Sequence, residues 1–64
     1  MEKHMQWMTT KFQTPPENVP LETKIHDRLG DRNVQILFRQ GKLWFVPDGS
    51  MYVYYEPTHW RYLG

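Results

Sequence analysis

The stretch VQILFRQGKLWFVPDGSMYVYY, residues 34–55, decides the fold because two turn signals divide it into three apolar segments. The signals are QG at residues 40–41 and PDG at residues 47–49, in which proline presets φ and glycine accepts positive φ. Within the segments, apolar residues recur with the period of two that is typical of strands. The stretch predicts a three-stranded antiparallel meander. Its strands cover residues 34–39, 43–46 and 51–55, and residues 60–63 can add a fourth short strand.

The two turns also assign the side chains to faces of this sheet. We take the first turn as a two-residue loop and the second as a type I turn followed by a glycine bulge. The first face, expected to form the core around Phe38, Phe45 and Val53, also holds Val34, Ile36, Leu43, Met51 and Tyr55. The second face holds Gln35, Leu37, Arg39, Trp44, Val46, Tyr52 and Tyr54. A slip of one residue in either turn would mix the two sets.

The preceding segment, PLETKIHDRL at residues 20–29, has the features of a short helix. Pro20 suits the first helical position, and Gly30 suits the C-terminal cap. An apolar stripe with a spacing of four residues is formed by Leu21, Ile25 and Leu29. Ten residues are too few for a helix that is stable alone in water. We therefore expect this helix to cover the core face of the sheet.

Residues 1–19 are expected to form an extended arm. Pro15, Pro16 and the nearby Pro20 disfavour helix in this region. Flexible linkers contain few large apolar residues, but this arm contains Met5, Trp7, Met8 and Phe12. We expect the arm to dock on another surface. The predicted fold is thus α+β, with the arm at residues 1–19 and a small helix-plus-sheet domain at residues 20–64.

Composition limits the classes of function. The chain has 64 residues, no cysteine, eight basic and seven acidic residues, and a net charge of +1. It therefore has neither disulfides nor thiolate metal ligands, and it lacks the clustered positive charge of a strong polyanion binder. It contains no apolar run of about 18 residues, and its first twelve residues lack the apolar centre of a signal peptide. We expect a soluble protein of a reducing compartment, without membrane contact.

Residues that could support catalysis or metal binding are few. His4, His26 and His59 are far apart in the sequence, whereas a zinc site needs three or four converging ligands. Acidic and basic residues alternate along residues 22–32, as on a solvated helix face. The sequence predicts no enzymatic activity, no metal and no cofactor.

The aromatic residues are the candidates for partner binding. The second face of the sheet offers Trp44, Tyr52 and Tyr54 beside Arg39, and further candidates are Trp7, Phe12 and Trp60. Exposed clusters of such rings mark interaction sites. Two alternatives to a protein partner stay open. The arm and closing segment could fold over this face, or single-stranded nucleic acid could stack on it with phosphates held by Arg39, Lys42 and Arg61.

Two resemblances rest on residues 41–60. The pattern G-x-L-W-F, G-x-x-Y-V-Y and a final tryptophan resembles a hairpin of tailed-bacteriophage virion proteins. This resemblance implies a small viral structural or accessory protein whose partner is a virion subunit, another copy of itself or a host protein, in the virion or the host cytoplasm. Trp44, Tyr54-Tyr55 and Trp60 resemble a WW domain more weakly, because the tryptophans are closer together than in that family.

Overall fold

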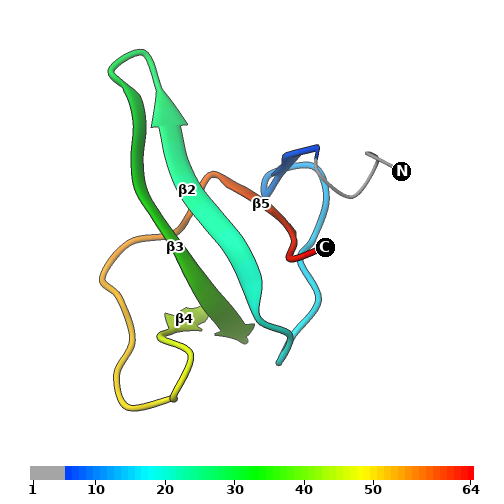
Figure 1. Cartoon of the computed structure of the whole chain (residues 1–64), viewed down its shortest axis with the longest axis vertical. Coiled ribbons are helices and arrows are strands. Elements are labelled where there is room, and N and C mark those ends of the chain that lie inside the picture. Colours follow the sequence, from blue (N-terminus) through cyan, green and yellow to red (C-terminus); the bar gives the residue numbers. More distant parts are fainter. Residues whose placement is uncertain (1–5) are drawn as a thin grey trace.

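The computed structural model describes residues 6–64, and it contains five β-strands and no helix within them (Figure 1). The strands are β1 (Met8–Thr9), β2 (Leu21–Asp27), β3 (Gly30–Gln40), β4 (Leu43–Phe45) and β5 (His59–Tyr62). They form one antiparallel sheet in the order β1-β5-β2-β3-β4. The protein is a small all-β domain, and the α+β prediction is wrong. Residues 6–64 include no helix of the length and apolarity that a membrane crossing requires.

Residues 20–29 form strand β2 and a turn instead of the predicted helix. A leucine or isoleucine every fourth residue also fits the period of two, because Thr23 lies between Leu21 and Ile25 on the same face. As a strand, this segment pairs along both edges, with β3 and with β5. Those pairings outweigh the small intrinsic stability of a ten-residue helix. Gly30 has a φ of +103° and opens β3 rather than capping a helix.

The β2–β3 hairpin contains a bulge at Asn33. Thr23 pairs with Gln35 and Ile25 pairs with Arg32, so Asn33 and Val34 both lie opposite the single residue between Thr23 and Ile25. Asn33 has a φ of +55°, in the left-handed region that asparagine tolerates better than most residues. A bulge of this kind bends the strand and increases its twist. Figure 1 shows the resulting long hairpin, with β5 and the N-terminal arm on one side and the yellow-to-orange segment on the other.

The turn between β3 and β4 differs from the prediction by one position. Gln40 pairs with Leu43, so the loop consists of Gly41 and Lys42. Phe38 therefore lies opposite Phe45 instead of Leu43. The shift moves the pairing by two residues, which leaves each side chain of β3 and β4 on its predicted face.

The second turn is one residue longer than predicted, and this changes the face on which the residues after the turn lie. The amide of Val46 donates to the carbonyl of Met51 (3.0 Å), and Phe45 forms an isolated bridge with Tyr52, so the loop covers residues 47–50. Within it, the amide of Ser50 donates to the Asp48 carboxylate (2.9 Å) and lowers the pKa of that carboxyl. Tyr52 consequently joins the face of Phe45. Beyond this bridge, the predicted third strand at residues 51–55 is not formed.

The core lies on the face that was expected to be the outer one. Its buried hydrophobic residues are Leu21, Leu37, Trp44 and Trp60, accompanied by the buried Thr23. Packed against them are Met8, Val19, Val46, Val53 and Tyr55. Thus Val53 contributes to the core as predicted, but Phe38 and Phe45 belong to the opposite face. Two differences from the prediction account for this inversion. The second loop is one residue longer, and no helix within residues 6–64 covers the face that contains Phe38 and Phe45.

Residues 6–19 of the N-terminal arm fold back on the chain's own sheet. Strand β1 pairs with β5, Pro15 is buried, and the carbonyl of Gln13 accepts a hydrogen bond from the Trp60 indole (2.9 Å). Further along, the amide of Asn18 donates to the carbonyl of Arg39 (2.8 Å). The arm thus covers the face of Trp44, which is one of the alternatives that the sequence left open for that face. The predictions for His4 and Met5 concern positions outside the described residues.

Candidate binding surface

The face of β3 and β4 opposite the core carries a group of apolar side chains that we call the outer aromatic surface. Its members follow from strand alternation, because Leu37 and Trp44 point into the core and their neighbours point away. The cross-strand pairs Phe38–Phe45 and Phe45–Tyr52 bring three segments together. The outer aromatic surface consists of Ile36, Phe38, Leu43, Phe45, Tyr52 and Tyr54.

Four rings of this surface form a continuous series of contacts. Phe38 and Phe45 are stacked, with centroids 5.5 Å apart and an interplanar angle of 15°. Phe45 meets Tyr52 edge-on at 5.9 Å, and Tyr52 meets Tyr54 edge-on at 6.0 Å. Aromatic pairs in such geometries contribute about 0.5–1.5 kcal/mol beyond their area burial. The rings therefore hold one another in place.

The surface is exposed and uncharged. Tyr54 is 95% exposed, Tyr52 45%, Leu43 43% and Ile36 40%, whereas Phe38 and Phe45 are half-buried. Monomeric soluble proteins rarely expose contiguous apolar patches beyond a few hundred Å². A ring series of this kind, left open to solvent, is typical of an interaction site.

The same face of the sheet becomes charged over β2 and β5. Glu22, which pairs with Ile36 across the β2–β3 ladder, accepts a hydrogen bond from Arg61 (2.8 Å). The half-buried Trp7 ring covers this region, with the Lys24 ammonium 4.3 Å and the Arg61 guanidinium 4.2 Å from its centroid. A charge-balanced strip thus borders the outer aromatic surface on one side.

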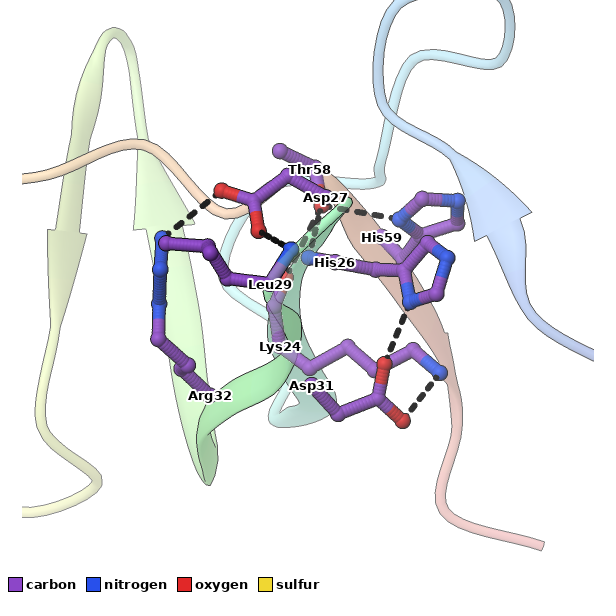
Figure 2. A network of polar contacts seen from close by, with 8 residues as sticks. All are labelled: Lys24, His26, Asp27, Leu29, Asp31, Arg32, Thr58 and His59. Carbon is purple, nitrogen blue, oxygen red and sulfur yellow. Dashed lines mark hydrogen bonds and ion pairs between the residues drawn. The ribbon is translucent and has the colours of Figure 1, made fainter.

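A polar network extends from this strip to the start of β5, and Figure 2 shows its members. Nδ1 of His26 lies 2.6 Å from Oδ1 of Asp31, and the Lys24 ammonium lies 3.0 Å from Oδ2. The hydrogen bond from His26, then that from Lys24, lowers the pKa of the Asp31 carboxyl. At the other end, Nδ1 of His59 lies 2.8 Å from the hydroxyl of Thr58, which also accepts from the amide of His26 (2.8 Å).

The network is built to hold strands together. His26 and His59 meet edge-on with ring centroids 5.6 Å apart, which connects β2 to β5. Burial, followed by the charges of Lys24 and His26, lowers the pKa of His59. Within residues 6–64, no three His, Cys, Asp or Glu side chains are grouped to hold a metal ion. The polar groups satisfy one another and leave the outer aromatic surface as the stronger candidate site.

The residues proposed for partner binding separate into two groups. Trp44 and Trp60 are 2% and 3% exposed and belong to the core. The Arg39 guanidinium binds the carbonyls of Pro15 (2.7 Å) and Gly41 (2.7 Å), so it fastens the arm to β3.

The other candidates are more accessible. Tyr52 and Tyr54 lie next to each other on the outer aromatic surface. The sequence predicts them beside Trp44, but Tyr52 contacts Phe45 instead. Phe12 is 80% exposed in the turn that follows β1, beside the ammonium of Lys11. Trp7 is half-buried over the charged strip.

Four members of the outer aromatic surface were assigned to the core from the sequence. They are Ile36, Phe38, Leu43 and Phe45. The signal that could have revealed them is the lack of alternation in Ile36-Leu37-Phe38 and in Leu43-Trp44-Phe45, which are apolar on both faces. Such strands give no preference for one face, so the choice depended on the turns.

Comparisons with protein-family models, with curated proteins and with solved structures find no significant match to this chain. The resemblance of residues 41–60 to hairpins of phage virion proteins stays a prediction.

Proposed function

We propose that the chain is a protein-binding module without enzymatic activity and that it acts through the outer aromatic surface. The observation that carries this proposal is the uncharged series of ring contacts from Phe38 to Tyr54, in which the two tyrosines are exposed and the two phenylalanines are half-buried. Tyrosine is enriched among the residues that dominate binding energy at protein interfaces. Rings that already hold one another lose little conformational freedom when a partner covers them.

The contacts that the basic side chains make favour a protein partner over nucleic acid. Of the three basic residues expected to bind phosphate, Arg39 is bound to backbone carbonyls, and Arg61 is paired with Glu22 beneath Trp7. Lys42 lies beside Tyr52 and Tyr54. Nucleic-acid binding rests on several cations that neutralise phosphates together. One lysine beside the rings supplies too little positive charge to hold a strand.

The resemblance to virion hairpins directs the search for the partner. It supports a structural or accessory role in a tailed phage, in the virion or in the cytoplasm of the infected host. A virion subunit is then the first partner to test, followed by a host protein.

Affinity capture with the tagged chain tests the proposal. Three forms are compared: wild type, Tyr54→Ser, and the control Leu29→Ser, since Leu29 is 77% exposed in the β2–β3 turn. Tyr54 is almost fully exposed, so its replacement leaves the fold intact. We expect wild type and control to capture the same partner and Tyr54→Ser to lose it. Equal recovery by all three forms would refute the proposal.

A titration with single-stranded oligonucleotide at low salt separates the two classes of partner. We expect no mobility shift and no change in tryptophan fluorescence. A shift that weakens steeply with added salt and disappears in Lys42→Gln would assign the surface to nucleic acid instead.

A further inference from the structure

Strands β3 and β4 have the sequence of a layer that is covered on both sides. Ile36-Leu37-Phe38 and Leu43-Trp44-Phe45 are continuous apolar runs, which are typical of strands buried on both faces. Antiparallel strands with one solvated face instead alternate apolar and polar residues. Within residues 6–64 the inner face is covered more completely than the outer one: Leu37 is fully buried, whereas Ile36 is 40% exposed and Phe38 and Phe45 are half-buried.

We propose that a second copy of the chain covers the outer aromatic surface, so that two β3–β4 layers pack face to face across a twofold axis. This inference rests on the proposed function and names its partner. A twofold interface uses the same patch on both copies, and sheets that pack face to face bury their facing side chains in a layer about 10 Å thick.

The exposed area reaches the lower end of the range that a dimer needs. The six side chains of the surface and the adjacent Val34, which is 52% exposed, present on the order of 600 Å², taking about 150–250 Å² for a whole large side chain. A standard interface takes about 800 Å² from each partner. Two copies together would bury on the order of 1,200 Å², which is the lower end of the range for specific interfaces.

The charge distribution suits a second copy. None of the six side chains is charged, so two copies can meet without placing like charges at the centre of the interface, and Lys42 lies at its border beside Tyr52 and Tyr54. In the bordering strip each carboxylate is paired with a cation: Glu22 with Arg61, and Asp31 with Lys24. The six side chains provide no charge pattern that would select a different protein over a second copy.

The small core gives a reason for the pairing. Four buried hydrophobic side chains form the centre of the described chain. Domains of about 60 residues bury only about 60% of their unfolded surface and often need staples or oligomerisation. No cysteine is present to supply a disulfide. A second copy would add a second apolar layer without any covalent link.

Sedimentation velocity of the purified 64-residue chain over a wide concentration range tests the inference. We expect wild type to approach twice the 7.8 kDa of one chain as concentration rises. Ile36→Lys places a charge at the interface, so its dimer dissociation constant should rise at least about tenfold. Leu29→Lys makes the same kind of change at an exposed apolar residue in the β2–β3 turn and should remain as dimeric as wild type.

A second variant guards against misfolding of Ile36→Lys. Tyr54 is 95% exposed, so Tyr54→Glu retains the fold, as far-ultraviolet circular dichroism can verify, and it should also weaken the dimer. A wild type that stays monomeric at all concentrations would overturn the inference. So would a dimer that is equally strong in Tyr54→Glu and wild type.

The two proposals fail separately. A monomeric chain that captures a partner through Tyr54 removes the second copy but keeps the binding module. A monomeric chain with equal capture by every form removes both. A dimer that Tyr54→Glu weakens supports this inference, and if nothing else is captured, self-association is the binding activity.

Discussion

The side chain of Trp60 shows how single residues fix this small sheet. Its ring is buried, its indole donates to the carbonyl of Gln13 (2.9 Å), and its centroid lies 5.3 Å from that of Tyr62. A buried indole needs a hydrogen-bond acceptor, because an unpaired polar group in the core costs about 1–3 kcal/mol. The arm supplies that acceptor. One side chain therefore connects the centre of the core to a segment 47 residues away.

Two threonines should respond in opposite directions to the same substitution. The hydroxyl of Thr10 is buried and has no hydrogen-bond partner among the described residues, whereas the hydroxyl of Thr23 donates to the carbonyl of Gln35 (2.8 Å). We expect Thr10→Val to raise the free energy of unfolding by about 1 kcal/mol and Thr23→Val to lower it by about the same amount. Urea denaturation of both variants measures the difference. Changes of the same sign would contradict the hydrogen-bond assignment.

His59 should make the fold sensitive to mild acid. Burial, then the charges of Lys24 and His26, lowers the pKa of His59 below its usual 6.5, so the unfolded chain binds more protons than the folded one near that pH. Stability should therefore fall as pH decreases from about 7 to about 5. The pKa of Asp31 is also lowered, but its effect on stability is confined to pH values below about 4.

Urea midpoints at both pH values check this prediction. His59→Gln cannot gain the proton, so it should lose less stability across that interval than wild type. An equal loss in both proteins would place the sensitivity at another group.

At the scale of elements, the sequence was informative about strands and misleading about their faces. The segments at residues 34–39 and 43–46 were predicted as strands and lie within or around β3 and β4, because glycine and apolar runs mark them clearly. Residues 20–29 were ambiguous, since a spacing of four satisfies both a helix and a strand. Tertiary pairing with two neighbours decided for the strand.

The candidate site depended on loop length in the same way. Tyr52 and Tyr54 were correctly placed on an exposed face, but Trp44 was not, because one extra residue in the loop at residues 47–50 changes which ring lies beside Phe45. Turn chemistry identifies a turn more reliably than its length. A strand that is apolar on both faces gives no signal by which a wrong assignment of its faces could be recognised.

The bulge at Asn33 can be tested as an element. A β-branched residue in the left-handed region costs about 1–2 kcal/mol, whereas glycine adopts it freely. We expect Asn33→Val to lower the free energy of unfolding by about that amount and Asn33→Gly to change it little. Thermal unfolding of the two variants provides the comparison. Equal stability would mean that the strand lacks the bulge.

At the scale of the whole molecule, the sheet has two unlike faces. The inner face is covered by the chain's own arm and by residues 53–57, while the outer face combines a charged strip with uncovered rings. The arm is therefore part of the domain rather than an appendage. The guanidinium of Arg39 and the backbone hydrogen bond from Asn18 attach it to β3.

Replacing Arg39 should loosen the arm. Arg39→Gln removes its charged hydrogen bonds to the carbonyls of Pro15 and Gly41, which should cost about 1.5–3 kcal/mol. Limited proteolysis should then cut more rapidly within residues 10–20. Arg28→Gln, in the exposed β2–β3 turn, is the control and should stay within about 0.5 kcal/mol of wild type. Equal cleavage of both variants would show that the arm's other contacts, such as the backbone hydrogen bond from Asn18 to Arg39, hold it without the guanidinium.

The position of β5 has a consequence for biosynthesis. This strand follows the other four in the sequence, yet it lies between β1 and β2 and supplies Trp60 to the core. On the ribosome, the earlier strands emerge with two unpaired edges and an incomplete core, and they can close only after residues 59–62 leave the exit tunnel. Contacts between such distant segments form late and slowly. The nascent chain is therefore expected to stay open to proteases and chaperones until residues 59–62 are available, and then to fold in a single step.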